Sequence, residues 1–288
     1  MSPRKRNKKR RGSFDPSKTT TLRQAFMRSM ARRILALKRG IRKWLVEEDE
    51  LGLVPRKPFK LSTHKRTFQF VSSPDKILAF RQWFQRQVNE GILEVDQREQ
   101  PWSNEYVNSA YRKGLVHSYL EGKRYLLTDA RAYSATEREF LREAFASPET
   151  TSKIQMIYTR TYNNLKGFSD AMSTQTSRIL ADGLAKGLHP EQIAEDMFFS
   201  IDGLSQKRAM VIARTEIIHA HAEGQLDGYE KLGVQDVGAD VEWSTAGDSR
   251  VCSECAEMEG QVMKISEARG LIPKHPNCRC AWIPVEQV

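Results

Sequence analysis

The chain has 288 residues, 39% of them apolar, which is enough for two domains with real cores and excludes a disulfide-dependent miniprotein. Its net charge of +10 is uneven, because residues 1–43 hold sixteen Lys or Arg and one acid, while the other 245 residues carry −5. No apolar run approaches the roughly 20 residues that cross a bilayer, and no signal-peptide core follows the basic start. We therefore expect a soluble, non-secreted protein that does not bind membranes.

Residues 1–20 are polar, contain Pro and Gly, and are predicted to form a disordered basic arm. Such arms bind phosphates without reading sequence, so we expect non-specific contact with double-stranded DNA. The alternatives are a solvated tail or a mitochondrial transit peptide, although "RKRNKKRR" is denser in charge than import requires. The expected DNA-binding residues are Arg4, Lys5, Arg6, Lys8, Lys9, Arg10 and Arg11.

The next segments read as helical. Apolar residues recur at three- and four-residue steps from Leu22 to Leu45, which predicts an amphipathic basic helix within residues 21–50. A second helical region is expected over residues 51–148. It should contain a helix at 74–90 that begins at Pro74, another from Pro101 to about 120, and a third opened by a capping box from Ser134 to Glu137.

Residues 149–288 are predicted to form one C-terminal domain. It should contain a helical stretch at 149–186, a short helix from Pro190, and a long helix capped by Ser205 that ends at Gly233. Valine and tryptophan content after residue 237 indicates a short strand. The predicted fold class is therefore mainly α, an extended helical region followed by a small α+β module at residues 243–288.

All four cysteines lie in that module. Cys252 and Cys255 are separated by two residues, and His275 and Cys278 repeat this gap after 19 intervening residues, a spacing typical of a closed zinc site. Cys280 is a fifth candidate ligand. In an extended segment Cys278 and Cys280 would face opposite ways, which favours His275; in a turn, Cys280 could replace His275. Disulfides are disfavoured because nothing indicates secretion, and a redox Cys-x2-Cys because no βαβ unit is evident.

The long helix carries a second group of polar residues. Glu216, His219 and Glu223 share one flank and could chelate a catalytic metal, but we interpret them as a solvated acidic face. The sequence has no paired acid and base and no nucleophile beside a histidine, so we expect no enzymatic turnover. The alternatives to a structural protein are a metal-dependent nuclease or a zinc-containing DNA-binding regulator.

With these motifs in place, residues 150–288 resemble the phage head morphogenesis family, the minor head proteins similar to the F protein of phage Mu. Three stretches carry the resemblance: "ARTEIIHAHAEGQLDGYEKLGV", "EWSTAGDSRVCSECAEMEGQV" and "IPKHPNCRCAWIPV". The motif residues are Arg214, Thr215, Glu216, Trp243, Asp248 and Arg250, together with Cys252, Cys255, His275, Cys278 and Cys280.

The resemblance implies an internal component of the virion head that associates with the portal protein and other head proteins. It also implies contact with packaged DNA during head assembly, packaging or ejection. The head itself would be assembled in the cytoplasm of the bacterial host. Some relatives carry a toxin domain after this module. Because the chain ends three residues past Val285, we expect none here.

Overall fold

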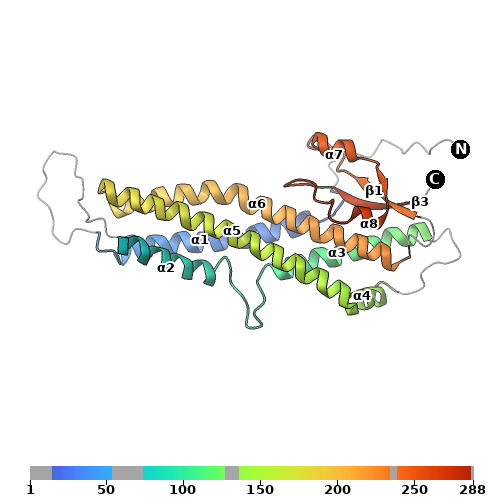
Figure 1. Ribbon diagram of the computed structural model, residues 1–288, viewed down its shortest axis with the longest axis horizontal. Helices are drawn as coiled ribbons and strands as arrows, with labels where there is room; N and C mark the ends of the chain where they lie inside the picture. Colours follow the sequence, from blue (N-terminus) through green and yellow to red (C-terminus); the bar gives the residue numbers. More distant parts are fainter. Residues whose placement is uncertain (1–14, 54–73, 127–135, 234–238, 287–288) are drawn as a thin grey trace, which may run out of the picture. The chain divides into compact units, whose positions relative to one another are not determined.

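The computed structural model describes residues 15–53, 74–126, 136–233 and 239–286. Helices dominate these residues, and one small sheet lies near the C-terminus (Figure 1). The predicted fold class, mainly helical with a C-terminal α+β module, is thus confirmed. Among the described residues, no helix combines the length and apolarity needed to cross a bilayer.

The chain divides into two compact units, each built from separate stretches. One unit takes the residues up to Phe26, Ser103–Thr159 and Ala213–Val288. The other takes Met27–Trp102 and Arg160–Ile212. The seven basic residues at positions 4–11 lie outside the described residues, so the predicted DNA contact of the arm stays a prediction.

The second unit is a helical assembly. It includes most of α1 (Thr20–Arg42), the π-helical turn η1 (Lys43–Glu47) and α2 (Pro74–Glu90). The predicted apolar stripe of the first helix is confirmed, because its members from Met30 to Leu45 are buried. Trp44 stacks on Trp83 of α2 with ring centroids 5.0 Å apart, which joins the end of α1 to α2.

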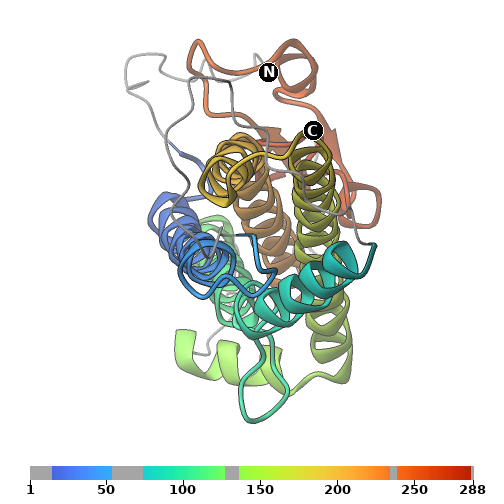
Figure 2. The same cartoon turned by 90° about the vertical axis from the view of Figure 1, so that its left-hand side faces the viewer.

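The longest helices are α5 (Pro148–Lys186) and α6 (Pro190–Lys231), and each contributes to both units. In the second unit they run side by side from a turn at Gly187, whose φ of +63° suits glycine (Figures 1 and 2). The helix start predicted at Pro190 is confirmed, but the helix is long rather than short, and the cap predicted at Ser205 is wrong. Ser205 lies inside the continuous α6, where its hydroxyl donates to the carbonyl oxygen of Asp202 over 3.3 Å.

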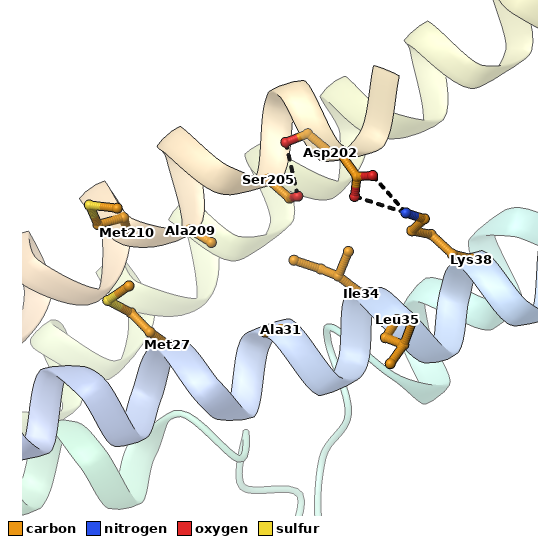
Figure 3. Close-up of a pocket in the computed structure, with 9 residues that line it drawn as sticks. All are labelled: Met27, Ala31, Ile34, Leu35, Lys38, Asp202, Ser205, Ala209 and Met210. Atoms are coloured by element: carbon orange, nitrogen blue, oxygen red, sulfur yellow. Dashed lines mark hydrogen bonds and ion pairs between the residues drawn. The ribbon is translucent and has the colours of Figure 1, made fainter. Parts of the chain in front are cut away.

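A pocket of about 330 Å³ lies between α1 and α6 in this unit. Its walls are mainly apolar, and Figure 3 shows Met27 and Ile34 of α1 facing Ala209 and Ser205 of α6. Lys38 closes one end through an ion pair with Asp202, with Nζ 2.7 Å from Oδ2 (Figure 3).

The first unit is organised by α3 (Asn104–Leu126) and the part of α6 after Ala213. Two glycines let these helices approach closely. A Cβ on Gly114 would lie 2.1 Å from the carbonyl oxygen of His221, and one on Gly224 would lie 2.2 Å from that of Tyr111. Any larger residue at either position would therefore force the helices apart.

Helix α4 (Glu137–Ala146) packs on α3 through Phe140 and Tyr119, whose ring centroids are 5.3 Å apart. Its capping box is formed by Thr136 and Glu139. The cap predicted at Ser134 lies outside the described residues. Helix α3 begins three residues later than Pro101 and continues to Leu126, beyond the predicted end.

Residues 15–19 precede α1 and belong to the folded unit, in contrast to the predicted disorder of residues 1–20. Ser17 and Thr19 are buried. Asp15 accepts hydrogen bonds from Ser17 and forms an ion pair of 2.6 Å with Arg23. The hydrogen bonds from Ser17 and Thr20 and the charge of Arg23 outweigh burial and lower the pKa of Asp15.

The sheet has the strand order β2-β1-β3 and is antiparallel. The C-terminal module contains, in chain order, β1 (Ala239–Ser244), α7 (Ser253–Met258), β2 (Val262–Met263), α8 (Ile265–Ala268) and β3 (Ala281–Glu286). Trp243 of β1 pairs in register with Trp282 of β3, and their buried rings meet edge to face. Gln225 of α6 donates to the carbonyl oxygen of Trp282 and accepts from its amide, which fixes β3 on the helix.

Candidate metal centre

The first cysteine pair lies where the loop after β1 enters α7. Cys252 is the N-cap of that helix, and its sulfur accepts a hydrogen bond from the amide of Cys255 over 3.4 Å. This backbone donor stabilises negative charge on sulfur, which is the role of the amide in a metal-binding knuckle. The separation of two residues therefore turns both sulfur atoms toward the same point.

The second pair lies in a turn, which decides how Cys278 and Cys280 face. The amide of Cys278 donates to the carbonyl oxygen of His275 over 3.1 Å, and Asn277 adopts a left-handed φ of +67°. The extended geometry that would separate Cys278 and Cys280 is thus wrong for this segment. Both thiols are buried and join Cys255 in one group.

Five donor atoms form the cluster. Nε2 of His275 lies 3.1 Å from Sγ of Cys252 and 3.1 Å from Sγ of Cys255. Sγ of Cys255 lies 3.9 Å from Sγ of Cys278. Cys255 is common to two groups of potential ligands, one with Cys252 and His275 and one with Cys278 and Cys280. A small cavity of about 20 Å³ among these side chains has room for about one ion or water molecule.

The tautomer of His275 suits metal binding. Its Nδ1 lies 2.7 Å from the carbonyl oxygen of Pro276, and because a carbonyl only accepts, Nδ1 carries the hydrogen. This leaves the lone pair of Nε2 directed at the two sulfurs. A hydrogen bond from the second nitrogen to a carbonyl is the usual way in which proteins orient a histidine ligand.

The thiols have divergent acidity because they are crowded together. Hydrogen bonding from Cys280 lowers the pKa of Cys278 to about 5, whereas burial and the neighbouring charge of Cys278 raise the pKa of Cys255 to about 12. Hydrogen bonding to Cys278 and burial also raise the pKa of Cys280. Ionisation of one thiol thus opposes ionisation of the neighbouring thiols unless a cation balances their charge. The donor set can therefore hold a metal ion.

The motif residues Asp248 and Arg250 lie beside the cluster. Asp248 accepts two hydrogen bonds from Arg279, at 2.7 and 2.6 Å, and a third from the more exposed Arg250 at 3.1 Å. Hydrogen bonding from Arg279 is the largest cause that holds the pKa of Asp248 well below its usual range. The ion pair between Asp248 and Arg279 links the loop before the first cysteine pair to the segment that carries the second.

The other motif residues connect the module to α6. Arg214 donates to Oδ1 of Asn277 at 3.4 Å, and Thr215 turns a buried hydroxyl inward. Trp243 forms the core of the sheet with Trp282. The structure thus brings Arg214, Asp248 and Arg250 to the second knuckle or its partner loop. Glu216 and Trp243 are buried, and Thr215 is half-buried.

The interpretation of Glu216 and Glu223 as a solvated face is wrong. Glu216 is 1% exposed and Glu223 is 9% exposed. Both oxygens of Glu223 are engaged: Oε1 accepts from the amide of Gly270 over 2.9 Å, and Oε2 lies 3.3 Å from Arg269. The turn after α8 covers Glu223 through Arg269 and Gly270, and the sequence does not show which segment covers this flank.

Several site residues had no sequence-based prediction. Arg279 could have been found, since it stands between two candidate ligands. Gln225 gives no signal, because a glutamine within a helix is ordinarily exposed. Asp227 is 4% exposed and contacts the hydroxyl of Tyr111, Lys153 at 2.6 Å and Arg269 at 2.7 Å. Its partners lie 116, 74 and 42 residues away in the sequence, beyond the reach of helix periodicity.

Fold and cluster together define a mainly helical protein whose C-terminal α+β module gathers cysteines and a histidine into a potential metal centre. Residues 174–283 match the family model described as Phage Mu protein F like protein, which confirms the resemblance seen in the motifs. This part of the chain is thus similar to phage Mu F-like proteins, which supports a phage head-related protein with a place in the virion and other head proteins as partners. Searches of curated proteins and of solved structures found no match.

Proposed function

We propose that this protein is a minor head protein that associates with the portal vertex and contacts packaged DNA, and that structural zinc holds its C-terminal module together. The observation that carries the proposal is the convergence of Cys252, Cys255, His275, Cys278 and Cys280 inside the region that matches the family. A metal ion bound there would keep the module rigid, so that the module could serve as a docking surface for the portal protein.

Zinc suits the donor set better than other metals. Thiolate and imidazole ligands favour zinc in proteins, and hard cations such as Mg²⁺ prefer oxygen. Tetrahedral zinc with bonds of about 2.3 Å to sulfur separates its sulfurs by about 3.8 Å, close to the 3.9 Å between Cys255 and Cys278. Cys252, Cys255 and Cys278 with either His275 or Cys280 would hold the ion.

A structural role is favoured because three of the five donors are buried and the other two are half-buried. Cys255, Cys278 and Cys280 are each at most 3% exposed, and the cavity beside them admits no substrate. The proposal includes no catalytic turnover, since the Glu223 carboxylate is held by Arg269 and Gly270. A plasmid-nicking assay with Mg²⁺ or Mn²⁺ tests this, and cleavage abolished by Glu216→Ala would overturn it.

Portal association is tested by mixing the full-length chain with the portal protein of the same phage and measuring co-elution by size-exclusion chromatography. The proposal expects a complex with the native chain and a weakened complex with Cys252→Ser, because loss of a ligand loosens the module. Ser253→Ala, at the adjacent exposed position, is the control and should bind as the native chain does. Absence of any complex with the native chain would contradict the portal role.

A further inference from the structure

Two adjoining pockets in the first unit bring together basic side chains that the sequence analysis did not single out. One pocket, of about 370 Å³, lies between residues 17–18, α3 and α6. The other, of about 910 Å³, lies between α3 and α4. Arg112 lines both pockets, so they form one continuous surface, here called the α3 basic surface. Its cations are Lys18, Arg112, Lys113, Arg138 and Arg142.

The cations of the smaller pocket are available to a ligand. Lys18, Arg112 and Lys113 are exposed, and within the described part of the chain none of the three forms an ion pair. The acid nearest to Lys18 in sequence, Asp15, is already paired with Arg23. Glu137 is the acid that lines the larger pocket, opposite three arginines. The surface is therefore strongly positive on a body whose residues after position 43 carry −5.

Histidines form the floor of the smaller pocket. His221 is 1% exposed and lines the pocket, and its Nδ1 has no hydrogen-bond partner among the described residues. His117 lies beside it, with ring centroids 5.5 Å apart. A buried polar atom without a partner is unfavourable, and a ligand atom could restore its missing hydrogen bond. In the tautomer that carries its hydrogen on Nδ1, His221 offers a donor at the floor, and this donor together with the cations at the rim suits an anion.

We propose that the α3 basic surface binds the phosphate backbone of nucleic acid, with one phosphate in the pocket of Lys18, Lys113 and His221. The inference rests on the DNA contact in the proposed function and assigns part of it to the folded body, independently of the arm. Repeated anions fit better than a single carboxylate. The cations extend over two helices, and Arg138 and Arg142 are one helical turn apart on α4.

A substitution series separates this surface from general charge. Arg112→Gln/Lys113→Gln removes two adjacent exposed cations from α3, and Lys207→Gln/Arg208→Gln removes an equivalent adjacent exposed pair from α6. Binding of the full-length chain to a 20-base-pair duplex is measured by fluorescence anisotropy at several salt concentrations. The double substitution in α3 should weaken duplex binding about 10- to 30-fold at 0.15 M salt and reduce the magnitude of the salt slope by about 1.8. The double substitution in α6 should change the affinity by less than about threefold.

A footprinting measurement does not depend on any variant. Lysine acetylation of the native chain, read by mass spectrometry, should slow at Lys18 and Lys113 when the duplex is present and stay unchanged at Lys207. Polyglutamate at equal charge should protect them less. Equal protection by polyglutamate would identify an acidic protein as the ligand and overturn the inference.

Other outcomes separate the inference from the proposed function. If deletion of residues 2–12 weakens duplex binding and the α3 pair does not, the arm alone contacts DNA and the inference is wrong. A native chain that does not bind the duplex would contradict both. Weakening by the α3 pair in the chain that lacks residues 2–12 would support the inference independently of the arm.

Discussion

Arg279 and Asp248 form a bidentate ion pair, with Nη1 2.7 Å from Oδ2 and Nη2 2.6 Å from Oδ1. The arginine lies between Cys278 and Cys280, and the aspartate lies four residues before Cys252. The pair therefore holds the two cysteine knuckles in register. Two parallel charge-assisted hydrogen bonds give this link both strength and direction.

Arg279→Gln should loosen the metal centre. Residues that support metal ligands typically contribute 10- to 100-fold to affinity, so we expect metal affinity to fall by about that factor. Competition with a chromophoric chelator measures it. Arg250→Gln is the matched control, because Arg250 contacts the same carboxylate over 3.1 Å but its side chain is 70% exposed. Equal effects of the two substitutions would contradict the assigned role of Arg279.

Gly224→Ala should strongly destabilise the first unit. The new Cβ would lie 2.2 Å from the carbonyl oxygen of Tyr111, and backbone atoms cannot yield without moving a helix. We expect a loss of about 3 kcal/mol or more in the free energy of unfolding, measured by urea denaturation.

Gly203→Ala is the control for that measurement. Gly203 lies on the same helix, and apart from the adjoining backbone of that helix no atom of the described residues lies within 4 Å of the position that the new methyl group would occupy. The substitution should leave stability unchanged or raise it by up to about 1 kcal/mol, since alanine is the better helix former. A Gly224→Ala protein as stable as the Gly203→Ala protein would show that α3 and α6 do not approach as described.

His221 should make stability depend on pH. Burial, and then the proximity of His117, lower its pKa to about 3, compared with about 6.5 in an unfolded chain. The unfolded state thus binds the proton first, and stability is lost as the pH falls below about 6.5 toward 3. Between pH 7 and pH 5 His221 should account for a loss of about 2 kcal/mol.

His221→Gln should remove this part of the pH dependence. Denaturation at both pH values, with the native chain beside the variant, measures the difference. His189→Gln is a control for an exposed histidine outside this unit. If the native chain and the His221→Gln variant lose the same stability between pH 7 and pH 5, His221 is already charged at neutral pH or is not buried.

The sequence predicted much of the fold and half of the site, for identifiable reasons. The apolar stripe of α1 follows from local periodicity, and the cysteine spacing anticipated a cluster that includes His275. The helix cap predicted at Ser205 was wrong because serine is only a local capping signal, which packing overrides within α6. The burial of Glu223 could not be foreseen, since Arg269 and Gly270 cover it from 46 and 47 residues away. The direction in which the Cys280 side chain points could not be predicted, because it depends on the left-handed turn at Asn277.

The basic arm should contribute a separate, salt-sensitive part of DNA binding. If roughly six of its charges neutralise phosphates, the slope of log affinity against log salt is near −5. Deletion of residues 2–12 should flatten that slope, with equal losses on two unrelated duplexes, because phosphate contacts carry no base information. A salt titration by fluorescence anisotropy measures it. Unchanged slope and affinity would show that the arm is a solvated tail.

Elemental analysis of the full-length chain, purified under reducing conditions, tests the central claim most directly. The account predicts about one zinc per chain, and a zinc content near zero for Cys255→Ser, whose thiol belongs to both groups of potential ligands. Circular dichroism of that variant should still report the long helices, because they pack independently of the metal. A native chain that is fully folded, contains no metal and has its four cysteines in two disulfides would contradict the account.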